Sequence, residues 1–386
     1  MPTERALINP EFLIWARDSA GRTIEEAAKR IKVKTEKVKS WENGEARPTV
    51  NQLRNLAWFY NRSLAFFYLP KLPQKEKKLR DFRTLPKKDS EKLSSELIFE
   101  IRKAKHRREI ALDLLKLNNE FIPAINFSLE LGRDYEDKAK KIRKLLNITI
   151  KDQFSFTGSY DALNKWREAL ESIGILVFQA RNIEIEEMRG FSISDKPLPV
   201  IILNISDHPN GRTFTLIHEL IHILLNKGGI CSLKEVRGTD EKERIEIFCN
   251  HIAGSMLVPK NSLMNEQLVA QKRNEIWEDK EIKFLANKYK VSWEVILRRL
   301  LILRKTSTYF YKMKKEEIET KYQSKTKKTG GFVPPDVLSI SRSGKLFTRL
   351  VLNSYHNNTI TSSDLSEYLG VRLKHIPNIE DSIFNE

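Results

Sequence analysis

The sequence predicts a multidomain, mainly helical protein built around a central α+β domain. Short amphipathic segments with helical spacing fill residues 1–70, which predicts a bundle of five short helices. After residue 125, short apolar runs typical of buried strands alternate with amphipathic helices, which predicts a small sheet covered by helices. Helical spacing returns over 336–386, and a length of 386 residues allows two or three domains.

Composition narrows the class of protein. The chain has 68 Lys and Arg residues against 51 Asp and Glu residues, a formal net charge of +17, which favours an anionic partner such as nucleic acid. Solvated lysine faces would give the same balance. The two cysteines, Cys231 and Cys249, exclude a disulfide-stapled scaffold and fit a reducing compartment. No signal peptide or membrane span is recognisable, so we expect a soluble, cytoplasmic protein without membrane contact.

The pattern divides the chain into five parts. Turn signals near Gly21 and Lys34 separate the N-terminal helices, and Pro70 ends the last of them. The expected parts are the helical bundle at 1–70, a basic linker and connecting helix at 71–124, the α+β domain at 125–311, a charged flexible joint at 312–335, and a C-terminal helical domain at 336–386.

Within the α+β domain the elements follow in order. The stretch "DALNKWREALESIG" predicts an amphipathic helix, and "ILVFQA", "RGFSIS" and "PVIILNIS" predict three strands. Three further helices are predicted by "TLIHELIHILLN", "EKERIEIFCNHIAGSMLVP" and "SWEVILRRLLILRKT".

The first of these three helices carries a candidate metal site. His218 and His222 are four residues apart, so both rings lie on one helical face and can reach the same metal ion. Glu219 is placed to take a proton from a water molecule bound to that ion. A metal-bound water and a carboxylate base together form a nucleophile for amide hydrolysis.

Two histidines leave a catalytic zinc site one protein ligand short. Glu246, on the next predicted helix, can complete a His2Glu set and leave the fourth position to water. Asn250, one turn later on the same face, can hold the free N–H of one histidine ligand. His251 could stabilise an oxyanion, but a lone histidine on a helix is more often structural.

The alternative is an ordinary core helix with two buried histidines. Six apolar side chains would seat such a helix: Leu216, Ile217, Leu220, Ile221, Leu224 and Leu225. Burying two histidines and a glutamate without a ligand costs desolvation free energy that nothing offsets, so the metal site is favoured.

A second candidate site lies in the N-terminal helices. Residues 23–57 have the period of two short helices joined by a tight turn at "IKVK", the arrangement of a helix-turn-helix unit whose second helix enters the major groove of DNA. Base edges and phosphates would be contacted by Thr35, Glu36, Lys37, Lys39, Ser40 and Asn43. The alternative is a small bundle used for protein contact or dimerisation.

Both candidate sites resemble known families. Residues 22–69 resemble the helix-turn-helix of Xre/Cro-type repressors, especially at "WENG", although Lys32 stands where a glycine usually opens the turn. Residues 125 to about 305 resemble the ImmA/IrrE family of zinc metallopeptidases through "RTFTLIHELIHILL" and "EIFCNHIAGSMLVP". In place of that family's alanine and phenylalanine, the second stretch has Cys249 and Ile252.

The resemblance implies a zincin-like domain of the gluzincin type, with Zn2+ held by His218, His222 and Glu246 and with Glu219 as general base. It further implies limited cleavage of one partner, such as an Xre-type repressor or a toxin or antitoxin, by a protein that also binds double-stranded operator DNA. A homodimer would fit a repressor-like module. The rival hypothesis is a transcriptional regulator or antitoxin whose zinc domain is only a sensor or a partner-binding scaffold.

Overall fold

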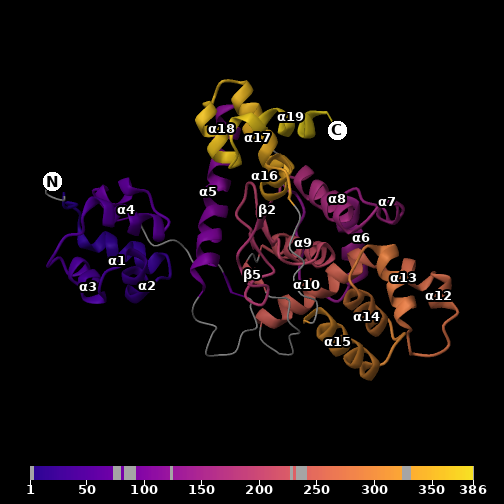
Figure 1. Ribbon diagram of the computed structural model, residues 1–386. Coiled ribbons are helices and arrows are strands. Elements are labelled where there is room, and N and C mark those ends of the chain that lie inside the picture. The colour runs from indigo at the N-terminus through magenta and orange to yellow at the C-terminus, as the bar shows by residue number, and fades with distance from the viewer. Residues whose placement is uncertain are drawn as a thin grey trace. The chain divides into compact units, whose positions relative to one another are not determined.

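The computed structural model describes residues 4–72, 80–81, 93–121, 125–226, 229–231, 241–323 and 332–385. The chain forms two compact units, one made of Met1–Lys78 and Leu85–Lys105 and the other of Leu79–Thr84 and His106–Glu386 (Figure 1). Each unit has its own hydrophobic core. The expected fold class, mainly helical with an α+β core, is confirmed.

The first unit is a small helical bundle. Its elements are α1 (Pro10–Ser19), α2 (Ile24–Ile31), α3 (Thr35–Glu42), α4 (Val50–Phe59), the 3-10 helix η1 (Leu64–Tyr68) and the first part of α5 (Ser95–Leu117). Thr23 and Thr49 begin α2 and α4 with capping boxes, in which each threonine hydroxyl accepts from a backbone N–H of the first turn. Trp41, Leu53 and Leu56 are buried in the core.

The turn between α2 and α3 accommodates Lys32 at the position where related turns usually have a glycine. Lys32 takes the left-handed conformation, with φ 58° and ψ 49°, directly after the last turn of α2. This conformation costs a residue with a Cβ about 1–2 kcal/mol relative to the right-handed one. The lysine therefore performs the geometric role that a glycine has in related turns, and α3 is still brought back against α2.

A mixed sheet forms the centre of the second unit. Its strands are β1 (Arg80–Asp81), β2 (Leu176–Ala180), β3 (Gly190–Ile193), β4 (Val200–Asn204) and β5 (Gly229–Cys231), in the order β1-β5-β3-β4-β2. Strand β3 is antiparallel to β4 and β5, whereas β2 is parallel to β4 and β1 is parallel to β5. The three expected strands are present; β1 and β5 are two additions, and β1 lies inside the expected linker.

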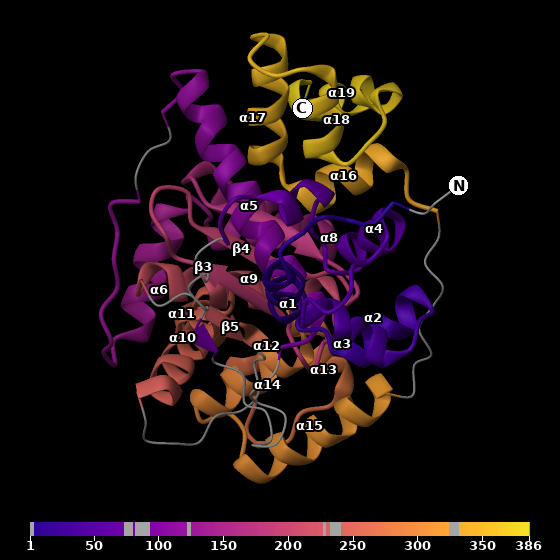
Figure 2. The same ribbon diagram turned by 90° about the vertical axis from the view of Figure 1, so that its left-hand side faces the viewer.

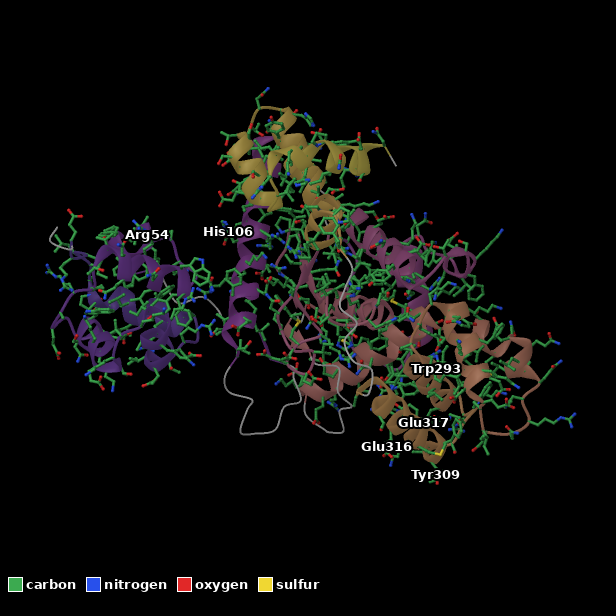
Figure 3. All side chains as sticks on the ribbon, in the orientation of Figure 1. Arg54, His106, Trp293, Tyr309, Glu316 and Glu317 are labelled. Atoms are coloured by element: carbon green, nitrogen blue, oxygen red, sulfur yellow. The ribbon has the colours of Figure 1, made fainter. Side chains whose placement is uncertain are left out.

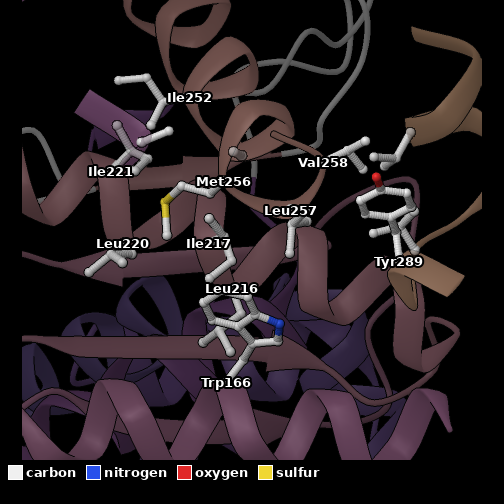
Figure 4. Close-up of a cluster of buried hydrophobic side chains, with 14 of the residues drawn as sticks. Trp166, Leu216, Ile217, Leu220, Ile221, Ile252, Met256, Leu257, Val258 and Tyr289 are labelled. Atoms are coloured by element: carbon white, nitrogen blue, oxygen red, sulfur yellow. The ribbon is translucent and has the colours of Figure 1, made fainter. Parts of the chain in front are cut away.

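Helices cover the sheet and form the main core. They are α6 (Tyr135–Leu145), α8 (Ser159–Ser172), α9 (Pro209–Leu224) and α10 (Glu241–Leu257). Helix α9 packs on β3, β4, α8 and α10. Figure 4 shows the apolar side of α9, where Leu216, Ile217 and Leu220 meet Trp166 of α8 and Met256 of α10. Five of the six apolar side chains expected to place this helix in the core are buried, and Leu225 is partly buried.

Smaller helices complete this region: α7 (Ile150–Ser155), α11 (Lys260–Met264), α12 (Gln267–Ala270), α13 (Asp279–Tyr289), α14 (Trp293–Ile302) and α15 (Thr308–Gln323). Helix α15 enters the segment expected to be a flexible joint, of which 324–331 lies outside the described residues. Its start is anchored by buried Phe310 and Tyr311, and Lys314 pairs with Asp279 at 2.6 Å. Figure 3 shows Tyr309, Glu316 and Glu317 along this helix.

The chain ends in a group of helices, α16 (Pro335–Ser343), α17 (Lys345–His356), α18 (Ser362–Leu369), the 3-10 helix η2 (Leu373–His375) and α19 (Ile376–Phe384). Helix α16 packs against β2 and α17 packs against α8. Across the described residues, the helices are too short or too polar to cross a bilayer.

Candidate metal centre and candidate DNA-binding helix

Three side chains from α9 and α10 meet at one buried point. His222 Nε2 lies 3.0 Å from Glu246 Oε1, His218 Nε2 lies 3.3 Å from Glu246 Oε2, and the two Nε2 atoms are 3.0 Å apart. The histidines are fully buried and Glu246 is 3% exposed. The structure thus brings together three metal-ligating groups that are separated by up to 28 positions in the sequence.

This cluster fits a zinc ion. Two donor atoms held about 2.1 Å from a tetrahedral zinc are about 3.4 Å apart, close to the separations found here. The Nδ1 atom of His218 is buried without a hydrogen-bond partner among the described residues, so the polar contacts of this ring are those of Nε2, within the cluster. Burial raises the pKa of Glu246, but the two histidines facing it lower that pKa by more, which favours the ionised form that a metal needs.

Glu219 lies beside the cluster and is held by a residue that the sequence did not single out. Ser192, on β3, donates its hydroxyl to Glu219 Oε2 at 2.7 Å, and both side chains are fully buried. A hydrogen bond to one carboxylate oxygen fixes the rotation of the group. The only sequence signal for Ser192 is its polarity within an otherwise apolar strand, "GFSI".

Gly190 allows strand β3 to approach helix α9 closely. A Cβ on Gly190 would lie less than 3.0 Å from Thr215 Cγ2, 3.0 Å from the carbonyl oxygen of Ile202 and 3.5 Å from Glu219 Cγ. The absence of a side chain at Gly190 therefore sets the distance between β3 and α9, and with it the contact between Ser192 and Glu219.

The C-terminal end of α10, the helix that carries Glu246, is held by buried hydrogen bonds. The last carbonyls of a helix have no partner within the helix, and here three buried side chains supply donors to them. Arg143 donates to the carbonyl of Met256 at 2.7 Å, Gln153 to that of Leu257 at 2.9 Å, and Arg299 to that of Val258 at 2.9 Å. Sequence periodicity gives no sign of this arrangement, because it depends on contacts between distant segments.

Two other predicted residues lie nearby without joining the cluster. Asn250 is half-buried on α10, and within the described part of the chain no hydrogen bond connects it to either histidine ligand. His251 stacks on Tyr135 with ring centroids 4.6 Å apart, a packing contact that supports a structural role.

The two cysteines are not among the candidate ligands that the described residues bring together. The backbone of Cys231 in β5 lies opposite Gly190 in β3, whereas its side chain is outside the described residues. Cys249 is a buried packing residue.

In the first unit, α3 presents most of the residues expected to contact DNA. Glu36, Lys37, Lys39 and Asn43 are exposed, and Thr35 and Ser40 are half-buried. The opposite face of α3 is anchored by buried Val38 and Trp41. Arg17 of α1 donates two hydrogen bonds, of 2.8 and 3.0 Å, to the carboxylate of Glu42 at the end of α3. This bidentate ion pair holds α3 against α1.

These features define a class: a helix-turn-helix module joined in one chain to a domain with the metal-ligand arrangement of a metallopeptidase. Comparison with family models agrees. Residues 13–67 match the model described as helix-turn-helix, and residues 170–301 match the model described as IrrE N-terminal-like domain, of the M78 peptidases. A comparison with curated proteins found no match. The chain is a fusion of an Xre-type helix-turn-helix domain with an ImmA/IrrE-like domain, the domain composition of an IrrE/ImmA-type regulator.

Proposed function

We propose that this chain is a DNA-binding, zinc-dependent endopeptidase of the gluzincin type, which regulates gene expression in the cytoplasm by limited cleavage of a partner protein. The observation that carries the proposal is the convergence of His218, His222 and Glu246 on one buried point, with Glu219 directly after His218 on the same helix. The family match over 170–301 supports it, because all four residues lie within that range.

Each residue has a separate role in the proposed chemistry. A zinc ion held by His218, His222 and Glu246 would supply Lewis acidity and a water molecule with a lowered pKa. Glu219 would serve as the general base and acid, taking a proton from the attacking water and returning it to the leaving amine. The hydroxyl of Ser192, which donates to Glu219 Oε2, would restrict the orientation of that carboxylate.

The N-terminal module is proposed to bind operator DNA through α3. The residues proposed to lie near base edges are Thr35, Glu36, Lys37 and Ser40, and those proposed to lie near phosphates are Lys39 and Asn43. The basic excess of the whole chain supports an anionic partner. A repressor of the same helix-turn-helix type, or a toxin or antitoxin, is the proposed substrate, and a homodimer is the proposed form on DNA.

The substitution Glu219→Gln tests catalysis directly. The amide keeps the shape of the side chain but cannot accept the proton, so zinc content and DNA binding should remain while a co-expressed partner is no longer cleaved. Proteome comparison of cells that express wild type or Glu219→Gln would identify the partner as a protein cut only by the wild type. If both proteins give the same regulatory output and the same proteome, the peptidase hypothesis is wrong and the sensor or scaffold hypothesis takes its place.

A further inference from the structure

The C-terminal helices lie outside both family matches, yet they share a core with the metallopeptidase-like domain. Phe347 of α17 is fully buried and meets Phe178 of β2 edge to face, with ring centroids 5.6 Å apart. Figures 1 and 2 both show α16 and α17 next to α8 at one end of this unit. Because α8 and β2 also belong to the layers around α9, the C-terminal helices are built into the domain that holds the metal cluster.

The junction between α16 and α17 is fixed by polar contacts. Gly344 has φ +75°, and a Cβ there would lie 2.8 Å from the carbonyl oxygen of Val177. Glu171 of α8 accepts hydrogen bonds from the backbone N–H groups of Lys345 at 3.0 Å and Leu346 at 3.3 Å, so it caps the start of α17. A shift at this junction would break both of these hydrogen bonds.

The end of α16 is held from the sheet. The carbonyl oxygen of Ser341 accepts from Gln179 Nε2 at 2.6 Å and from Arg167 Nη2 at 3.0 Å. Gln179 also donates to the hydroxyl of Ser341 at 2.9 Å. Ser341 is one of the last residues of α16, so its carbonyl has no partner within the helix and needs these donors.

The oxygen of the Gln179 amide connects the same side chain to helix α9. Gln179 Oε1 accepts a hydrogen bond from Arg212 Nη1, and Arg212 is 4% exposed on α9, six positions before His218. An amide is the group that can donate to the α16 carbonyl on one side and accept from the arginine on the other. Since α9 is a continuous helix from Pro209 to Leu224, a displacement of Arg212 is transmitted to the histidine rings.

We propose that Gln179 is a positioning residue through which the C-terminal helices hold α9 in the orientation that zinc binding requires. The proposal rests on the proposed function of the metal cluster. Metal sites tolerate errors of only about 0.5 Å in ligand position, so a link that fixes the start of α9 raises the affinity of His218 and His222 for the ion. Segment 335–384 is then a required part of the metal domain.

The test uses the full chain and measures zinc affinity by competition with a chelating indicator. Gln179→Leu removes both links, and Gln179→Glu keeps the acceptor for Arg212 but loses the donor to Ser341. We expect both to raise the zinc Kd about tenfold, the effect typical of residues that orient metal ligands. Gln179→Glu is the milder variant if Gln179→Leu does not fold, and its Kd is then judged by the same twofold limit; Ser341→Ala, which removes only the hydroxyl contact, should change the Kd by twofold or less.

Ser339→Ala is the matched control. Ser339 donates to the carbonyl of Leu369 at 2.7 Å, a buried hydrogen bond within the C-terminal helices that has no link to α9. It should lower the stability of these helices and leave the zinc Kd unchanged. Hydrogen exchange of α9 in the metal-free protein should rise in Gln179→Leu and not in Ser339→Ala.

The outcomes separate the two proposals. A zinc Kd for Gln179→Leu within twofold of wild type, or an equal rise in Ser339→Ala, overturns the positioning role and leaves the metal site intact. A wild-type chain that binds no zinc overturns the proposed function and, with it, the positioning role.

Discussion

The close approach of β3 to α9 predicts that Gly190→Ala damages the metal domain from a position that holds no functional group. The new methyl group would lie less than 3.0 Å from Thr215 Cγ2, whereas ordinary carbon contacts are about 3.5–4.0 Å. The strand and the helix must therefore separate by at least about 0.5 Å. Overpacking of this kind in a core costs about 1–3 kcal/mol.

The separation has a second consequence at Glu219. The hydrogen bond from Ser192 is 2.7 Å long, so a shift of that size stretches it beyond about 3.2 Å, outside the usual range for hydroxyl donors. We expect faster hydrogen exchange in β3 and α9 of the metal-free protein, together with reduced cleavage by the zinc-loaded protein. Stability and activity should fall together.

Thr215→Ser provides the control, because it removes the Cγ2 atom that the new methyl group meets first. The double variant Gly190→Ala/Thr215→Ser should recover about half or more of the lost protection, leaving the 3.0 Å approach to the Ile202 carbonyl as residual strain. If the double variant is as unstable as the sum of the two single variants, the clash with Thr215 is not the cause and the reasoning fails.

Two further predictions concern Glu171 and α3. Burial raises the pKa of Glu171 from 4.5 to about 7, because it outweighs the opposing effects of Arg167 and of the N–H groups of α17. A carboxyl whose pKa is raised by folding stabilises the protein below pH 4.5 and loses that contribution as pH rises through 7, here 2.5 pKa units or about 3 kcal/mol. Hydrogen exchange in α17 should therefore be faster at pH 8 than at pH 5 after correction for intrinsic rates, and Glu171→Gln should flatten this pH dependence. The same pH dependence in wild type and Glu171→Gln would contradict the role of Glu171. In gel-shift titrations on operator DNA, Lys37→Ala and Lys39→Ala should each reduce the slope of the logarithm of the association constant against the logarithm of the salt concentration by about 1. The control Lys283→Ala, at an exposed position on α13, should leave this slope unchanged. Slopes equal to wild type in both α3 variants would show that α3 does not contact the DNA.

The sequence predicted those parts of the fold that local patterns specify. Strands β2, β3 and β4 are apolar runs between turn signals, and α9 has helical spacing from Thr215 onward, so each was recognisable alone. The first turns of α9, from Pro209, were not predicted, because "PNGR" has the composition of a loop. Strands β1 and β5 have two and three residues, too few for any periodicity to show. The helical start of the expected joint was missed because α15 is highly charged and is stabilised by ion pairs with other helices.

The candidate site divides in the same way. His218, Glu219 and His222 lie within one helical turn, so their spacing alone indicates a metal site. Glu246 could be predicted as a ligand because the next helix in the sequence carries a suitable acidic residue. Ser192 and Gly190 could not be found, because their importance depends on which strand the tertiary fold places against α9. For the same reason, Gln179 appeared only as a polar residue in a buried strand.

The zinc content of the purified full chain, measured by inductively coupled plasma mass spectrometry, decides whether the proposed metal site exists. Because three candidate ligands converge on one point, we expect one zinc per chain in wild type and in Glu219→Gln, whose substitution leaves these three residues in place. We expect almost none in Glu246→Ala, where only two histidines remain. Zinc retained at wild-type level by Glu246→Ala, or absent from wild type refolded with excess zinc, would contradict the proposed metal site.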